Sequence, residues 1–267
     1  MTDTATWDCH VHVIGDHDRF PLSPTRGYTP PVATLQALFA HLDSIGSARA
    51  VIVQPSVYGS DNSCLLDALA HSEGRCVGVA VPDPDSSIAD LGALRAAGIC
   101  GIRCNLINAG GLPFAATQKW WPWMRDHGWH LQLQIDCTRT DLEALLATPG
   151  VPPVVIDHMG FPPPGSGVDA VAGLVAQVAA RNVYAKISAP DRIVAKPPQY
   201  ATALDIAAAL LDAAPEYCLF GTDWPHTELT APVMPDRDWH KTVRKLAGAH
   251  WSSLHAAALE LYTPRHT

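Results

Sequence analysis

The sequence is poor in charge and contains no long hydrophobic run. Only 16% of its 267 residues are charged, and the formal net charge is -8. An acidic balance argues against nucleic acid or an anionic membrane surface as a partner. No uninterrupted apolar run approaches the length of a membrane span, and the beginning, MTDTATWD, lacks the basic and apolar segments of a signal peptide. We therefore expect a soluble cytoplasmic protein with no nucleic-acid or membrane partner.

Motifs for disulfide frameworks and for nucleotide binding are also missing. The seven cysteines are an odd number and show no CxxC or CxxH spacing, which predicts reduced thiols in a cytoplasmic core. No GxGxxG or GxxxxGK[ST] follows a predicted strand, so nucleotide binding has no support.

What the sequence does contain is an alternation of short β-branched runs with Ala- and Leu-rich segments. Several of the latter open on Ser, Thr or Asp and close on Gly or Pro, as helices do. The predicted strands are Trp7–Val13, Ala48–Gln54, Cys76–Val81, Gly101–Leu106, Trp129–Ile135, Pro153–His158, Val183–Ser188 and Tyr217–Gly221. Eight strands with helices between them favour a closed (β/α)8 barrel over an open doubly wound sheet. We predict a single α/β domain over residues 1–267, with extra helices from about Asp238 onward.

Polar residues gather near the carboxyl ends of these predicted strands, where barrels of this kind place their reactive groups. They are His10, His12, Gln54, Arg103, Gln132, Gln134, His158, Ser188 and Asp223. Because side chains alternate along a strand, His10 and His12 project to the same side. If that side is the lumen, both histidines can meet Asp223, which follows the last strand.

Each of these residues also has a structural interpretation. A single histidine in a strand is more often hydrogen-bonded than catalytic, and an aspartate after a strand is commonly a helix N-cap. The histidine pair and Asp223 taken together favour a site. Arg103 needs a partner because an unpaired cation in an apolar strand is costly, so it serves either an internal salt bridge or a ligand. The predicted packing residues are Trp120, Trp121, Met159 and the cysteines.

Five motifs in this order resemble the amidohydrolase superfamily, in its lactonase branch around 2-pyrone-4,6-dicarboxylate lactonase. They are DCHVHVIG, IVQPSVYGSDN, GIRCN, VIDHMGFP and FGTDWPH. The resemblance runs from Trp7 to Tyr262 and implies a distorted (β/α)8 barrel that opens or closes a cyclic ester. It implies that Asp223 is the general base, with His10, His12 and His158 around the scissile carbonyl. The predicted substrate-binding residues are Tyr28, Arg103 and Arg192, implied by the resemblance, together with Gln54 and Gln134 at the strand ends.

The residue types at the strand ends favour a mechanism without metal or other cofactor. Members of the superfamily that need metal usually add a carboxylated lysine or a glutamate on strand four, or a histidine on strand five. Here strand four offers Arg103, and strand five offers Gln132 and Gln134. A cation opposes a bound dication, and amide oxygens are poor zinc ligands beside imidazole. The alternative is one zinc ion held by His10, His12, His158 and Asp223.

The expected partner is a small lactone that carries one carboxylate or a hydroxyl group, such as a muconolactone, a pyrone or a sugar-acid lactone. The loop after strand four, NLINAGGLPF, contains no Lys or Arg, so a second carboxylate would lack a cation. Gln134 also stands where the nearest lactonases are expected to have an aromatic residue. Three functions compete: a metal-independent lactone hydrolase, a zinc-dependent hydrolase or decarboxylase, and a non-catalytic barrel that binds a small acid. The presence of a base and three histidines disfavours the last, and the oligomeric state stays open.

Overall fold

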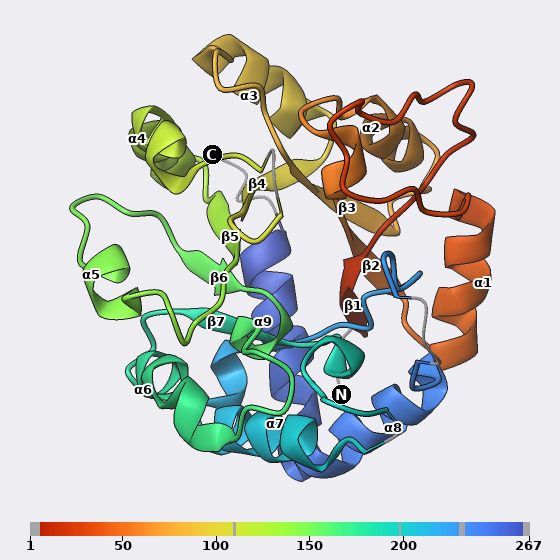
Figure 1. The fold of residues 1–267 in the computed structure, drawn as a ribbon. Coiled ribbons are helices and arrows are strands. Elements are labelled where there is room, and N and C mark those ends of the chain that lie inside the picture. Colours follow the sequence, from red (N-terminus) through yellow and green to blue (C-terminus); the bar gives the residue numbers. More distant parts are fainter. Residues whose placement is uncertain (1–5, 109–110, 198, 230–232, 264–267) are drawn as a thin grey trace.

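A parallel sheet of eight strands, rolled into a barrel, forms the centre of the molecule (Figure 1). The structure is a computed structural model that describes residues 6–108, 111–197, 199–229 and 233–263. The strands pair in chain order and are β1 Trp7–Val11, β2 Arg49–Val53, β3 Cys76–Ala80, β4 Ile99–Asn105, β5 His130–Gln134, β6 Val154–Ile156, β7 Tyr184–Ile187 and β8 Cys218–Phe220. The predicted (β/α)8 barrel is confirmed.

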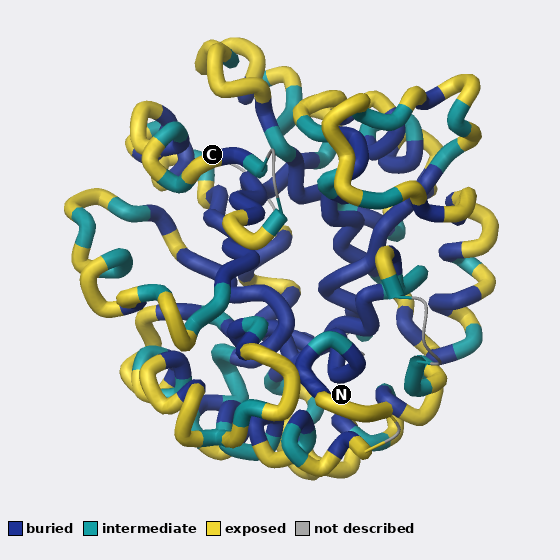
Figure 2. The backbone as a smooth tube through the Cα atoms, viewed as in Figure 1, coloured by how far each residue is buried: buried dark blue, intermediate teal, exposed yellow. Residues whose placement is uncertain are grey.

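Helices surround the sheet, and their exposed sides face outward while the strands are buried (Figure 2). They are α1 Leu35–Ile45, α2 Ser63–Ala70, α3 Ile88–Ala96, α4 Trp121–Asp126, α5 Leu142–Leu146, α6 Ala172–Ala179, α7 Ala201–Ala213, α8 Asp236–Ala247 and α9 Trp251–Tyr262. The two ends of α1 show how the sequence sets where a helix begins and ends. The Thr34 side chain accepts a hydrogen bond from the Ala37 N–H, and Gly46 ends the helix with φ 72°, a conformation that favours glycine.

The two C-terminal helices confirm the predicted extra helices. Inside the barrel, one buried apolar cluster joins residues of several strands to one side of α9. Tyr262 is fully buried there, with its ring centroid 6.0 Å from that of Trp7. Since Trp7 begins β1, this cluster lies at the amino-terminal end of the barrel. Helix α9 therefore closes the amino-terminal end of the barrel and leaves the carboxyl end open for a polar site.

A β-bulge in β1 decides where its histidines point. Trp7 and Cys9 belong to the apolar cluster inside the barrel, so strict alternation would turn the next residue, His10, away from the lumen. Asp8 pairs with Ala50 and Val11 pairs with Ile52, which leaves one extra residue in β1. This bulge resets the alternation, and His10 and His12 reach the lumen.

The barrel closes beyond the end of β8 rather than along it. The Asp223 N–H donates to the His10 carbonyl oxygen at 2.9 Å, and the His12 N–H donates to the Trp224 carbonyl oxygen at 2.8 Å. Asp8, fully buried, braces the same seam because its carboxylate accepts from the Thr222 N–H at 3.0 Å and the Thr222 hydroxyl at 2.7 Å. The seam residues are thus held by both backbone and side chain.

The side chains that were predicted to pack in the core are mostly buried. Trp120, Trp121 and Met159 are buried, as predicted. All the cysteines except Cys137, which is partly exposed, are buried. No helix in the described ranges is long and apolar enough to cross a membrane.

Candidate active site

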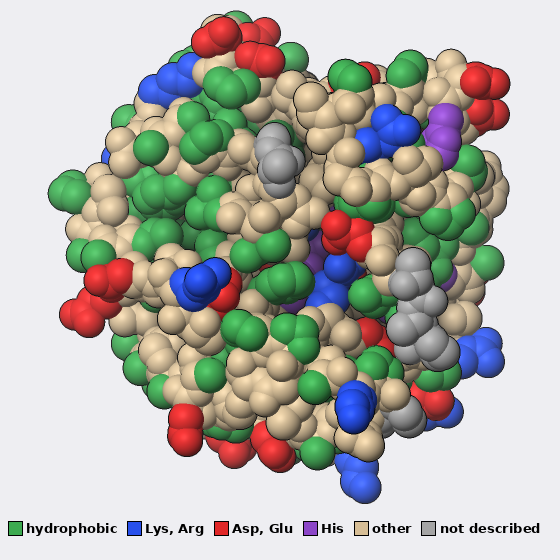
Figure 3. All heavy atoms as spheres, in the orientation of Figure 1, with side chains coloured by type: hydrophobic (Ala, Val, Ile, Leu, Met, Phe, Trp, Pro, Cys, Tyr) green, Lys and Arg blue, Asp and Glu red, His purple; other side chains and the backbone are tan. Residues whose placement is uncertain are grey.

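A small polar pocket opens at the carboxyl ends of the strands, at the end opposite to α9. Figure 3 shows the hollow, in which basic, acidic and histidine side chains meet. The pocket is lined by His12, Tyr28, Ser56, Arg103, Asn105, Asn108, Gln134, His158, Arg192, Asp223, Thr227 and Glu228. Most of the predicted site residues are therefore brought together.

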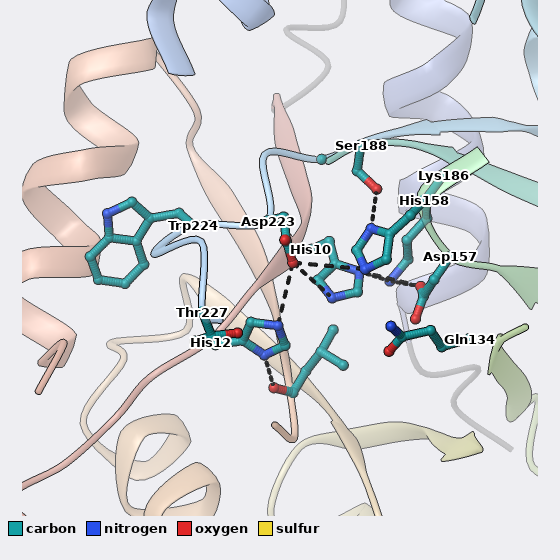
Figure 4. Close-up of polar contacts among 12 residues, drawn as sticks. His10, His12, Gln134, Asp157, His158, Lys186, Ser188, Asp223, Trp224 and Thr227 are labelled. Carbon is teal, nitrogen blue, oxygen red and sulfur yellow. Dashed lines mark hydrogen bonds and ion pairs between the residues drawn. The ribbon is translucent and has the colours of Figure 1, made fainter. Parts of the chain in front are cut away.

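Three imidazoles converge on one carboxylate oxygen (Figure 4). The Nε2 atoms of His10, His12 and His158 lie 3.7, 3.5 and 3.8 Å from Asp223 Oδ1. All four side chains are buried, and Asp223 Oδ1 has no hydrogen-bond partner among the described residues. This geometry is the one that the sequence predicts for these residues. His158 differs from expectation only in its element, because it lies in the 3-10 turn His158–Gly160 after β6, with φ 52°.

The Nδ1 atoms of these histidines have partners that indicate which ring nitrogen carries the proton. His12 Nδ1 lies 2.7 Å from the Val53 carbonyl oxygen, which only accepts, so Nδ1 carries the proton and Nε2 presents a lone pair. His10 Nδ1 lies 3.2 Å from Asp157 Oδ1 and 3.4 Å from Lys186 Nζ. A lysine ammonium only donates, so His10 Nδ1 can accept from it and Nε2 can carry the proton. His158 Nδ1 lies 3.0 Å from the Ser188 hydroxyl, which can donate, so His158 can also carry its proton on Nε2. The site thus joins one acceptor, His12, with two rings that can donate.

Arg192 keeps Asp223 charged. Its Nε lies 2.7 Å from Asp223 Oδ2. Burial by itself raises the pKa of Asp223, but the positive charge of Arg192 and the neighbouring histidines hold that pKa well below its usual range. Burial also lowers the pKa of His158 to about 4. At neutral pH the site therefore contains an ionised carboxylate beside a neutral imidazole.

A second buried group of charges lies beneath the histidines. Lys186 Nζ is 3.3 Å from Asp157 Oδ1 and 3.4 Å from His10 Nδ1, and Gln132 donates to Asp157 Oδ2 at 3.1 Å. Burial lowers the pKa of Lys186, while Asp157 raises it. Neither Asp157 nor Lys186 was predicted. The signal was available, because Lys186 interrupts an apolar strand two residues before Ser188 and therefore shares its face.

The predicted substrate-binding residues divide into two groups. Tyr28, Arg103, Gln134 and Arg192 line the pocket. The side chain of Gln54 does not line it: its amide donates to the carbonyl oxygens of Gly59 at 3.3 Å and Asp61 at 2.7 Å. Gln54 continues the outward face of β2, and so it braces the following loop. Only its backbone carbonyl oxygen serves the site, by accepting from Arg103 Nη1 at 3.0 Å.

Arg103 has the internal partners that one of its two interpretations requires, and it also lines the pocket. Its Nη2 donates to Gln134 Oε1, and its Nε lies 3.7 Å from Asp157 Oδ2. That Nε has no hydrogen-bond partner among the described residues. Arg103 is therefore a buried member of an internal charge network and also part of the pocket wall.

Two loops meet at the mouth of the pocket through contacts that the sequence did not reveal. Glu228 Oε2 lies 3.2 Å from Arg192 Nη1, and the Asn108 amide donates to Glu228 Oε1 at 3.0 Å. The Tyr28 hydroxyl donates to Thr227 Oγ1 at 3.2 Å. Glu228 directly follows the FGTDWPHT stretch, but its partner Asn108 is far away in sequence, so no local pattern indicates the pair.

The converging atoms also form a set that fits one divalent cation. The ligand atoms of His10, His12 and Asp223 lie within 4.8 Å of one another, as do those of His10, Asp157 and His158. Imidazole nitrogen and carboxylate oxygen are common zinc ligands, and the Nδ1 contacts of the histidines match the way in which zinc-binding histidines are anchored. Against this, Arg192 already occupies Asp223 Oδ2, and Lys186 and Arg103 place further positive charge nearby.

A parallel barrel with an H-x-H pair at the end of β1, a histidine after β6 and an aspartate after β8 indicates the class of this protein. The chain belongs to the amidohydrolase family, whose sequence profile matches residues 7–252. The family membership that the motifs predict, and with it the prediction of a hydrolytic enzyme, is confirmed.

The relatives within this family include lactone hydrolases. The chain is 32% identical over 227 residues to the 4-sulfomuconolactone hydrolase of Hydrogenophaga intermedia, covering 83% of this chain and 75% of the relative. It is 33% identical over 246 residues to the 2-pyrone-4,6-dicarboxylate hydrolase of Comamonas testosteroni, covering 86% and 79%. Among solved structures, a probable 2-pyrone-4,6-dicarboxylic acid hydrolase of Acinetobacter baumannii with bound citric acid matches with a TM-score of 0.81, 26% identity and coverage of 96% and 98%.

Proposed function

We propose that this protein hydrolyses a small lactone that carries one carboxylate or a hydroxyl group, with Asp223 as general base. The observation that carries the proposal is the buried Asp223 Oδ1, which has no hydrogen-bond partner among the described residues although three imidazole Nε2 atoms lie 3.5 to 3.8 Å from it. An ionised carboxylate oxygen without a donor can accept a proton from an attacking water molecule. The lactone hydrolases among the relatives support the same reaction class.

In this mechanism a water molecule donates one proton to Asp223 as its oxygen attacks the lactone carbonyl carbon. The resulting oxyanion needs donors. His158, whose Nε2 can carry a proton, and the guanidinium group of Arg103 line the same pocket. When the ring C–O bond breaks, protonated Asp223 returns its proton to the leaving oxygen. One water and one lactone thus give one ring-opened acid, and Asp223 ends ionised.

We further propose that this reaction runs without a metal ion or other cofactor. Arg192, Arg103 and Lys186 support this proposal because they already place positive charge around the site. That charge stabilises the ionised base and would repel a divalent cation.

We also propose a cytoplasmic location, which the predicted reduced cysteines support.

A zinc-dependent hydrolase or decarboxylase is the second candidate, and the convergence of three imidazoles on Asp223 Oδ1 favours it. His10, His12, His158 and Asp223 would hold the ion. A bound zinc ion would polarise the carbonyl group and lower the pKa of its water.

One experiment separates these candidates from each other and from a non-catalytic barrel. Purified protein is assayed on a panel of neutral, carboxylated and hydroxylated lactones with a pH indicator, and the same sample is analysed for metal. Ring opening by metal-free protein supports the proposal, and activity that tracks stoichiometric zinc supports the second candidate. Thermal stabilisation by small acids without turnover of any lactone would leave only the binding barrel.

A further inference from the structure

An acidic residue stands at the mouth of the pocket and has no role in the proposed chemistry. The Glu228 side chain is 34% exposed, whereas Arg192, its ion-pair partner, is 7% exposed. Glu228 follows the seam after β8 and lines the pocket together with Asp223. It therefore lies at the boundary between solvent and the reacting groups.

All three guanidinium nitrogen atoms of Arg192 already have partners. Its Nε pairs with Asp223 Oδ2 at 2.7 Å, its Nη2 donates to the Thr227 carbonyl oxygen at 2.6 Å, and its Nη1 pairs with Glu228 at 3.2 Å. One positive charge thus faces two carboxylates. Arg192 consequently offers an incoming substrate carboxylate much less than a free guanidinium would offer.

The formal charges of the described pocket lining balance. Two arginines, Arg103 and Arg192, stand against two ionised acids, Asp223 and Glu228. Across the mouth from Glu228 lies Asn108, an uncharged residue of the loop after β4, which donates to Glu228 at 3.0 Å. Without Glu228 the described lining would carry one net positive charge, which would attract an anion.

The backbone at Glu228 also departs from ordinary geometry. Its φ is 71°, in the left-handed region that favours glycine. Residues held in this region cluster at functional sites, where surrounding contacts keep them in place. Here the contacts to Arg192 and Asn108 hold the carboxylate over the pocket.

We infer that Glu228 is a specificity-determining residue that disfavours rings with several carboxylates and so selects monocarboxylated or neutral lactones. This inference rests on the proposed lactone hydrolysis. An incoming anion meets the Glu228 carboxylate before it reaches Arg103, and like charges in a partly desolvated pocket repel. The penalty grows with each carboxylate on the ring, which makes Glu228 a filter for substrate charge rather than for shape.

The test compares kcat/KM of wild type and Glu228→Gln on neutral, monocarboxylated and dicarboxylated lactones of one ring size. The substitution keeps the side-chain size and one acceptor but removes the charge. We expect the ratio of dicarboxylated to neutral kcat/KM to rise about tenfold, with a smaller rise for the monocarboxylated ring and a weaker effect at high salt. Glu73→Gln is the matched control, because Glu73 is exposed and lies just before β3, at the other end of the barrel. It should leave all ratios unchanged.

A second variant protects the test against misfolding at position 228. Asn108→Lys adds a cation beside Glu228 and should raise the same ratio. If neutral lactones are hydrolysed but neither variant changes the ratio, the inference is overturned while the proposed function stands. An equal gain on all three substrates also overturns it, since that result indicates a wider mouth. If wild-type protein hydrolyses none of the lactones, the proposed function fails and the inference falls with it.

Discussion

Replacing Asp223 by asparagine separates the proton acceptor from the shape of the site. The amide oxygen can still accept from Arg192 Nε, which lies 2.7 Å from Asp223 Oδ2, so the side chain should stay in place. The position facing His10, His12 and His158 loses its negative charge. What is removed is the capacity to take a proton from water, while the backbone hydrogen bond from residue 223 to the His10 carbonyl oxygen remains.

The expected loss follows from this role. Loss of general base catalysis costs roughly two to four orders of magnitude in kcat, whereas KM should change little because Arg103, Gln134 and Tyr28 still line the pocket. The folded protein should become less stable. Arg192 holds the pKa of Asp223 well below its usual range, so the ionised carboxylate stabilises the fold at neutral pH. We therefore expect the melting temperature of Asp223→Asn to fall below that of wild type, because the buried Arg192 loses its charged partner.

The assay measures initial rates of ring opening together with thermal unfolding of the same samples. Asp236→Asn is the control: Asp236 contacts His226 at 3.0 Å near the seam but does not line the pocket, and it should retain most of the activity. Turnover near the wild-type value in Asp223→Asn would refute the role of Asp223 as base. A rise in KM with unchanged kcat would show that Asp223 binds substrate instead.

Three further predictions follow from the buried charges. Prolonged chelation should leave activity intact; loss that zinc restores would favour the metal-dependent candidate. Because the pKa of His158 is lowered to about 4 from 6.5, the unfolded chain binds more protons between these values, so the free energy of unfolding should fall as pH drops from about 6.5 to 4; denaturant titrations that show no fall contradict this. Lys186→Met should cost about 3–5 kcal/mol of stability because Asp157 loses its partner. Adding Asp157→Asn should recover much of that loss, and additive losses in the double variant would contradict the pairing.

The meeting of His10, His12 and Asp223 could be predicted because polar residues of this kind are unusual in and after apolar strands. A histidine pair inside an apolar strand, and an aspartate directly after one, are costly unless they serve a site. In a parallel barrel all strand ends meet at one face, so His10, His12 and Asp223 could be placed together from sequence order alone. His158 followed from the same reasoning, although it lies just past its strand.

The outward side chain of Gln54, the bulge in β1 and the contact between Glu228 and Asn108 could not be predicted from the order of residue types. Gln54 was expected in the pocket because it ends a strand. Its side chain instead points outward, because Val51 and Val53 fill the lumen and side chains alternate along the strand. The sequence alone does not show which of the two alternating sets faces inward. The bulge in β1 shifts such an alternation by one residue and leaves no mark in composition. Glu228 and Asn108 meet only because two loops far apart in the sequence fold over the same mouth.

The way in which the barrel closes has a consequence for dynamics. The hydrogen bonds that join β1 to the segment after β8 belong to Asp223 and His12 themselves. An aspartate on a free loop could move independently of the barrel, but Asp223 cannot leave its position unless the barrel opens. Amide hydrogen exchange at His12 and Asp223 would therefore report the opening of the barrel and the disassembly of the site as a single event. Any solution condition that loosens the seam should abolish activity before the helices unfold.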